Sequence, residues 1–147
     1  MGITGQILKL RNMNVEKLKQ ARLDRQWRAQ ATAPFIGEVY KKVKAVNVEV
    51  EITFKSGVLR NPSINKWRRD LGPSDRLYLH YECTNRDCTG NGFYLTQALQ
   101  KALESRSCIE GEMWCDGKED WKHIKSSGCS CMTCLKYKIE PQFEDAQ

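Results

Sequence analysis

Apolar and polar residues alternate most regularly between residues 39 and 54. Val46, Val48, Val50, Ile52 and Phe54 alternate there with Asn47, Glu49, Glu51 and Thr53. A period of two places successive side chains on opposite faces of a β-strand. The pattern therefore predicts a strand over Val39–Phe54 with one buried face and one solvated face.

Shorter apolar patterns predict three more strands, over residues 77–83, 111–115 and 135–139. In the first of these, Leu77, Leu79 and Tyr81 share one face, and Tyr78, His80 and Glu82 share the other. The last is expected to face inward with Leu135, Tyr137 and Ile139. Residues 65–75 are predominantly polar and predict a loop or a short helix.

Two segments have the period of an α-helix. Residues 15–31 follow Asn14, a capping residue, and contain no Gly or Pro before Pro34. Residues 96–105 continue an apolar face formed by Leu95, Leu99, Ala102 and Leu103. The expected fold is an α+β domain with an antiparallel sheet, a helix inserted between strands and a separate N-terminal helix.

The N-terminal helix has a narrow apolar stripe on an otherwise basic surface. It is expected to pack on the domain through Leu23 and Trp27. Alternatively it is a basic arm that lies on phosphate or on an acidic protein. A helix on a membrane surface is the third alternative, but the apolar face is too thin to favour it.

The 147 residues are expected to form a basic arm (1–36), one domain (37–140) and a loose acidic tail (141–147). The chain has no long apolar run and no secretory pattern at its first residues, so we expect a cytoplasmic location and no membrane partner. The net charge of +6 is uneven: residues 1–36 carry seven basic and two acidic side chains, whereas residues 77–147 carry eight basic and eleven acidic ones. An acidic partner should therefore meet the N-terminal half.

All seven cysteines lie between residues 83 and 134, and six of them stand at turn-like positions there. In a reducing compartment such clustering favours a metal over disulfides. Structural zinc takes four soft ligands, usually two from each of two turns. We expect one structural zinc ion whose ligands come from Cys83, Cys88, Cys115, Cys131 and Cys134. Cys83 and Cys88 form the first pair, and which of the other three complete the site stays open.

Other interpretations of the cysteines are an iron–sulfur cluster, a disulfide framework or ordinary free thiols. Cys108 precedes a strand and is expected to be a buried small apolar residue, and Cys129 is a surplus thiol. His123 and His80 are not favoured as ligands.

The order strand, Cys83-x4-Cys88, strand, Cys115, then Cys131-x2-Cys134 and a strand resembles a zinc ribbon. Over about the last 75 residues the chain also resembles small uncharacterised bacterial proteins of this kind. The resemblance implies a fold stabilised by metal and says little about activity.

Basic residues around an aromatic side chain indicate nucleic-acid binding, because a ring can stack on a base while cations meet phosphate. The residues predicted to bind nucleic acid are Arg22, Arg25, Arg28, Lys66, Trp67, Arg68 and Arg69. The expected function is a non-catalytic binding module for nucleic acid or a nucleoprotein complex; the alternative is a subunit that binds an acidic protein. A zinc site closed by thiolates argues against an enzyme and against a small-molecule substrate.

Overall fold

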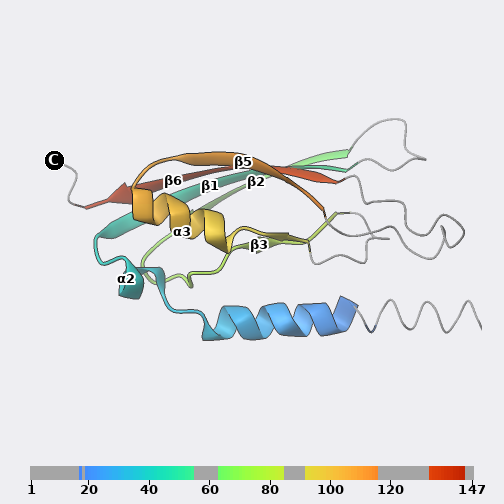
Figure 1. Cartoon of the computed structure of the whole chain (residues 1–147), viewed down its shortest axis with the longest axis horizontal. Coiled ribbons are helices and arrows are strands. Elements are labelled where there is room, and N and C mark those ends of the chain that lie inside the picture. Colours follow the sequence, from blue (N-terminus) through green and yellow to red (C-terminus); the bar gives the residue numbers. More distant parts are fainter. Residues whose placement is uncertain (1–16, 18, 55–62, 85–91, 116–132, 145–147) are drawn as a thin grey trace, which may run out of the picture.

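An antiparallel sheet of four strands, in the order β2-β1-β6-β5, forms one side of the molecule (Figure 1). The computed structural model describes residues 17, 19–54, 63–84, 92–115 and 133–144. The strands are β1 (Val43–Phe54), β2 (Ser63–Leu71), β5 (Ile109–Trp114) and β6 (Cys134–Phe143). The expected α+β class and antiparallel sheet are confirmed.

Strand β1 has the two faces that its alternation predicts. Val46, Val48 and Ile52 are fully buried on the inner face, which we define as the face covered by helix α3, and Glu49 is exposed on the outer face. The strand begins later than expected. Residues Ile36–Val39 instead form the short helix α2, in which the Tyr40 N–H donates to the Ile36 carbonyl and the Ile36 side chain is fully buried.

The prediction of a loop or short helix over residues 65–75 is wrong, because most of that segment belongs to β2. Strand β2 pairs with β1 over its whole length. Lys66 lies opposite Glu51 and Arg68 lies opposite Glu49, and opposite charges at such positions stabilise a strand pair. This exposed edge strand therefore forms without a regular apolar alternation of its own.

Helix α3 (Thr96–Ser105) has the expected bounds, and its apolar face is buried on the sheet as predicted. Beside it lies a small hairpin of β3 (His80–Tyr81) and β4 (Phe93–Tyr94), which forms a separate sheet. The predicted strand over 77–83 is thus reduced to two residues, although Leu77 and Leu79 are buried as expected. Strand β6 continues to Phe143, past the expected start of the tail at residue 141.

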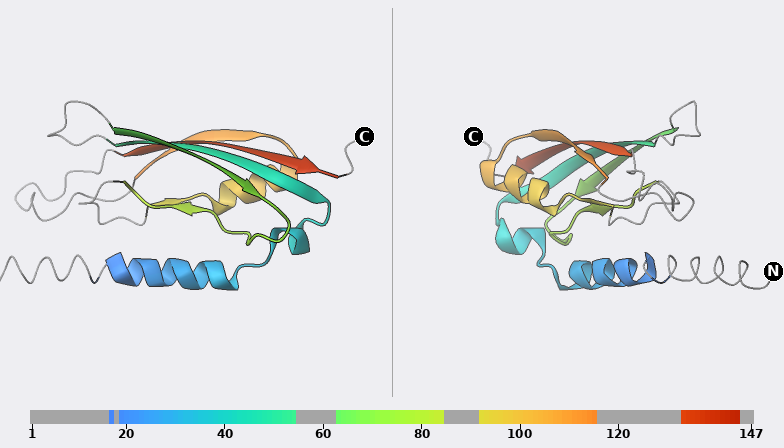
Figure 2. Two further views of the ribbon diagram at one scale, coloured as in Figure 1. Left: turned by 180° about the vertical axis from the view of Figure 1, so that it is seen from behind. Right: turned by 45° about the vertical axis from the view of Figure 1, so that its right-hand side comes forward.

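The N-terminal helix, residues 19–32, forms a third layer (Figure 2). It lies on the far side of the β3–β4 hairpin from the four-stranded sheet. The expectation that it packs through Leu23 and Trp27 is wrong, since these side chains are 43% and 73% exposed. The helix instead turns Arg22 and Gln26 toward the hairpin. None of the helices in the described ranges is long and apolar enough to cross a bilayer.

Candidate functional site

A groove of about 740 Å³ runs between the N-terminal helix and the β3–β4 hairpin. The helix forms one wall with Arg22, Arg25, Gln26 and Ala29. The opposite wall consists mainly of aromatic side chains contributed by three separate segments. These are Tyr78 and His80 before and in β3, Tyr94 in β4, and Trp114 at the end of β5.

The aromatic side chains of this groove are arranged as a connected group. The ring centroids of Tyr78 and Tyr94 are 5.8 Å apart at an edge-to-face angle, and those of Tyr78 and His80 are 6.4 Å apart and nearly parallel. Such geometries are favourable for aromatic pairs and hold the rings in place. Tyr94 and Trp114 remain 49% and 60% exposed, so their ring surfaces are accessible to a ligand.

Two polar contacts fasten the helix wall to the hairpin. The Arg22 Nη2 donates to the Glu82 Oε2 at 2.9 Å, and the Gln26 Nε2 lies 3.0 Å from the His80 Nε2. Arg22 and His80 are largely buried by this contact, whereas Glu82 is partly exposed. The charge of Arg22 is therefore paired with Glu82, and this ion pair holds the N-terminal helix against the hairpin segment.

Arg25 lines the same groove and is exposed. No acidic side chain is among the described residues that line the groove. The cationic helix wall and the aromatic wall thus combine charge with ring surface. This combination suits a ligand that has planar rings and negative charge.

The backbone of the groove depends on Gly92, which has a φ of +74°. A Cβ atom there would lie 2.6 Å from the Tyr81 carbonyl oxygen and 3.1 Å from the His80 ring. Only glycine tolerates both the left-handed conformation and this close approach. The hairpin that presents Tyr94 is therefore built around Gly92.

Burial is the main cause that raises the pKa of Tyr78, and the neighbouring Tyr94 and Glu82 raise it further. The Tyr78 phenol therefore stays un-ionised to a higher pH than that of a free tyrosine. The hydroxyl adds no negative charge near neutral pH.

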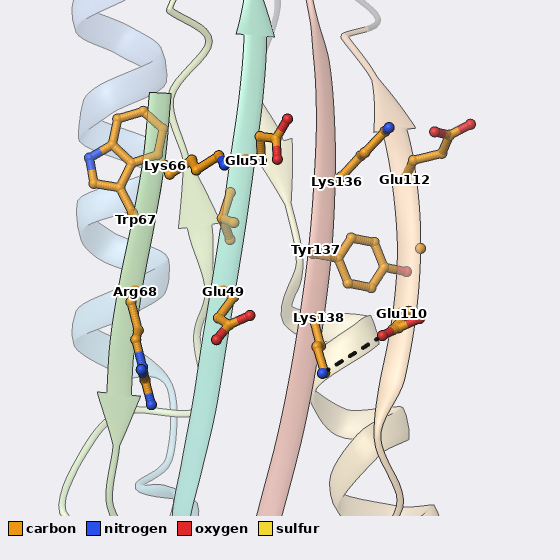
Figure 3. A pocket seen from close by; sticks show the side chains of 12 residues that line it. Glu49, Glu51, Lys66, Trp67, Arg68, Glu110, Glu112, Lys136, Tyr137 and Lys138 are labelled. Carbon is orange, nitrogen blue, oxygen red and sulfur yellow. Dashed lines mark ion pairs between the residues drawn. The ribbon is translucent and has the colours of Figure 1, made fainter. Parts of the chain in front are cut away.

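The structure does not bring the seven residues predicted to bind nucleic acid onto one surface. Arg22, Arg25 and Arg28 lie on the N-terminal helix. Lys66 and Arg68 lie on the outer face of β2, on the opposite side of the molecule (Figures 1 and 3). Trp67 and Arg69 point to the inner side of β2, where the Trp67 ring lies 6.4 Å from Tyr81.

On the outer face the β2 cations belong to two rows of alternating charge, which Figure 3 shows across all four strands. One row consists of Lys66, Glu51, Lys136 and Glu112, and the other of Arg68, Glu49, Lys138 and Glu110. The Lys138 Nζ and Glu110 Oε1 are 4.0 Å apart. The side chains of these two rows line a shallow hollow of about 730 Å³. Each row contains two cations and two anions, so this face has no excess of positive charge.

Three of the cysteines predicted to bind zinc lie within the described residues. Cys115 belongs to the buried apolar cluster on the inner face, and Cys83 packs against that cluster. Cys88 and Cys131 lie outside the described residues, as do His123 and Cys129. Cys108 is exposed, so the expectation that it is a buried apolar residue is wrong.

Cys134 lies on the other face of the sheet. It stands in one row with Thr53 and Trp114, and its side-chain direction matches that of the exposed Lys136. Burial, and then the charge of Glu112, raise the pKa of its thiol. Within the described ranges, no three Cys, His, Asp or Glu side chains gather closely enough to hold a metal ion.

The chain was compared with protein-family models, curated proteins and solved structures. The chain matches no protein-family model, no curated protein and no solved structure.

Sequence reasoning missed the aromatic wall of the groove. The pattern did place Tyr78, His80 and Glu82 on one face of their segment. Nothing local indicated that the N-terminal helix would lie over that face, or that Tyr94 and Trp114 would join it. The available signal was that residues 77–83 have a polar and aromatic face opposite their apolar face.

Proposed function

We propose that the protein is a non-catalytic binding module, stabilised by zinc, that binds nucleic acid in the groove between its N-terminal helix and the β3–β4 hairpin. The observation that carries the proposal is that Arg25 and the exposed rings of Tyr94 and Trp114 line the same groove. Bases stack on aromatic rings, and guanidinium groups bind phosphate.

The groove favours nucleic acid whose bases are unpaired. The faces of stacked base pairs are hidden inside a duplex, so a ring such as Tyr94 has nothing to stack on there. An unpaired strand offers both a base face and a phosphate within a short distance.

The zinc ion is proposed as a structural element close to this groove. Cys83 follows Glu82, which anchors the helix, and Cys115 follows Trp114, which lines the groove. Both thiols lie on the inner side of the sheet, and thiolates are the ligands that structural zinc prefers. Cys88 and Cys131 would complete the set. The outward direction of Cys134 supports leaving it out.

The experiment that tests the function is direct binding of labelled oligonucleotides, single-stranded and duplex, by fluorescence anisotropy. Unpaired strands should bind in a salt-dependent manner. Arg25→Gln and Tyr94→Ala should each weaken binding, because they remove the charge and the ring surface of the groove. No binding of any DNA or RNA at low salt would sink the proposal.

A protein partner is the second candidate function. The exposed Leu23 and Trp27 favour it, because they stand one helical turn apart on the surface of the N-terminal helix. A stoichiometric partner that is retained after nuclease treatment, and lost with Trp27→Ala, would support this alternative.

A further inference from the structure

The two edges of the four-stranded sheet carry complementary residues. Because each pair of neighbouring strands is in register, six unbroken rows cross from β2 to β5. Each row begins at one of the residues 64–69 and ends at one of the residues 114–109. Both edge strands therefore present six residues in matching order.

The outer-face rows end in opposite charges. Lys66 and Arg68 stand at the β2 edge, and Glu112 and Glu110 stand at the β5 edge of the same rows (Figure 3). Among the described strands, each cation has a single neighbouring strand, and so does each of these carboxylates. A strand added at either edge in the same register would continue the alternation of charge.

Exposed apolar side chains lie at the same edges. Ile64 on β2 is 54% exposed, and Trp114, which ends the same row on β5, is 60% exposed. The inner-face row that begins at Trp67 ends at Gly111. Glycine leaves space for a large ring opposite it, as it already does for Tyr137 within the sheet.

We propose that the β5 edge of one copy of the chain adds to the β2 edge of a second copy and extends the sheet from molecule to molecule. All neighbours in the sheet are antiparallel, so β2 and β5 run in opposite directions and a translated copy again makes an antiparallel pair. In the continued register Glu112 meets Lys66 and Glu110 meets Arg68, and Trp114 stands in the row of Ile64. The interface is heterologous and leads to a head-to-tail chain of copies.

Like edges do not fit each other. Two copies of β2 paired antiparallel about Trp67 would bring Lys66 against Arg68, and two copies of β5 paired about Gly111 would bring Glu110 against Glu112. Charged edge strands of one sign block their own pairing. Opposite signs on the two edges block the symmetric dimers and leave the β2–β5 contact.

The test is sedimentation velocity of the full chain from low to high micromolar concentration, after nuclease treatment. The wild-type protein should associate as concentration rises, and more weakly at high salt. The double variants Lys66→Glu/Arg68→Glu and Glu110→Lys/Glu112→Lys should each stay monomeric. An equimolar mixture of the two should associate again, because each variant then offers the edge that the other needs.

A matched control has the same change in net charge away from both edges. Lys44→Glu/Lys101→Glu alters two exposed lysines and should associate like the wild type. Should a reversed variant fail to fold by circular dichroism, Ile64→Ser and Trp114→Ser replace it, each weakening association about tenfold. A wild type that is monomeric at every concentration, or folded variants whose mixture stays monomeric, would overturn the proposal.

Discussion

Gly111 lies directly opposite Tyr137 on the inner face of the sheet, and the tyrosine ring covers the glycine. A Cβ atom at Gly111 would lie 2.5 Å from the Tyr137 hydroxyl oxygen and 2.7 Å from the ring carbon that carries it. Because Gly111 on β5 has no side chain, the Tyr137 ring on β6 can occupy the space beside it. Figure 3 shows the Tyr137 ring directed from β6 toward β5 at this position.

Gly111→Ala should destabilise the fold. The added methyl group must displace the Tyr137 ring or part the two strands, and overpacking of this kind costs about 1–3 kcal/mol. The free energy of unfolding in urea measures the effect.

Gly72→Ala is the control for that variant. A Cβ atom at Gly72 has the Asp75 carboxylate oxygen at 3.9 Å as its nearest neighbour. Its stability should stay within about 0.5 kcal/mol of the wild type. Equal effects of the two substitutions would contradict the role of the Tyr137 ring.

Two cysteines on neighbouring strands should differ in their effect on bound zinc. Cys115→Ser should lose the metal and most of the stability that it supplies, because folding and zinc binding are coupled in structural sites. Cys134→Ser should keep about one zinc ion per chain, since its thiol points to the outer face. Mass spectrometry of the native protein counts the metal. Loss of zinc from Cys134→Ser with retention in Cys115→Ser would reverse the proposed assignment.

Stability should fall at alkaline pH through tyrosine ionisation. Burial raises the pKa of Tyr81 above its ordinary value of 10.0, with a smaller opposing effect from Arg69. The folded state therefore favours the neutral phenol, so this contribution is complete below about pH 10 and is lost as the pH rises through the folded-state pKa.

Tyr81→Phe isolates that effect from the titration of lysines. Within the described residues the Tyr81 hydroxyl has no hydrogen-bond partner, so the substitution should change stability little at pH 7. Between pH 8 and pH 11 the loss of unfolding free energy should be smaller in Tyr81→Phe than in the wild type. Identical pH profiles would show that Tyr81 is ionised equally in both states.

How far the sequence predicts the fold depends on whether an element's signal is local. Helix α3 was predicted to its ends because four apolar residues on one face are enough to define it. Strand β2 was missed because the residues that it pairs with, Glu49 and Glu51 among them, lie on another strand. No pattern within residues 63–71 contains that information.

The candidate site could likewise be predicted only where its signal is local in the sequence. The basic character of the N-terminal helix was visible, but its orientation depends on Arg22 reaching Glu82, sixty residues away. Leu23 and Trp27 are its largest apolar side chains and were expected to anchor it. Polar contacts to the hairpin determine its orientation instead, and the aromatic wall of the groove becomes a site only through that packing.

The measurement that tests the account most directly is the affinity of Tyr94→Ala for a single-stranded oligonucleotide, compared with the wild type and with Trp27→Ala. Tyr94 lines the groove, whereas the equally aromatic Trp27 is exposed outside it. Tyr94→Ala should lose about 1–3 kcal/mol of binding free energy, the usual worth of one stacked base. Trp27→Ala should bind like the wild type. Unchanged affinity in Tyr94→Ala, or a larger loss in Trp27→Ala, would contradict the groove as the binding site.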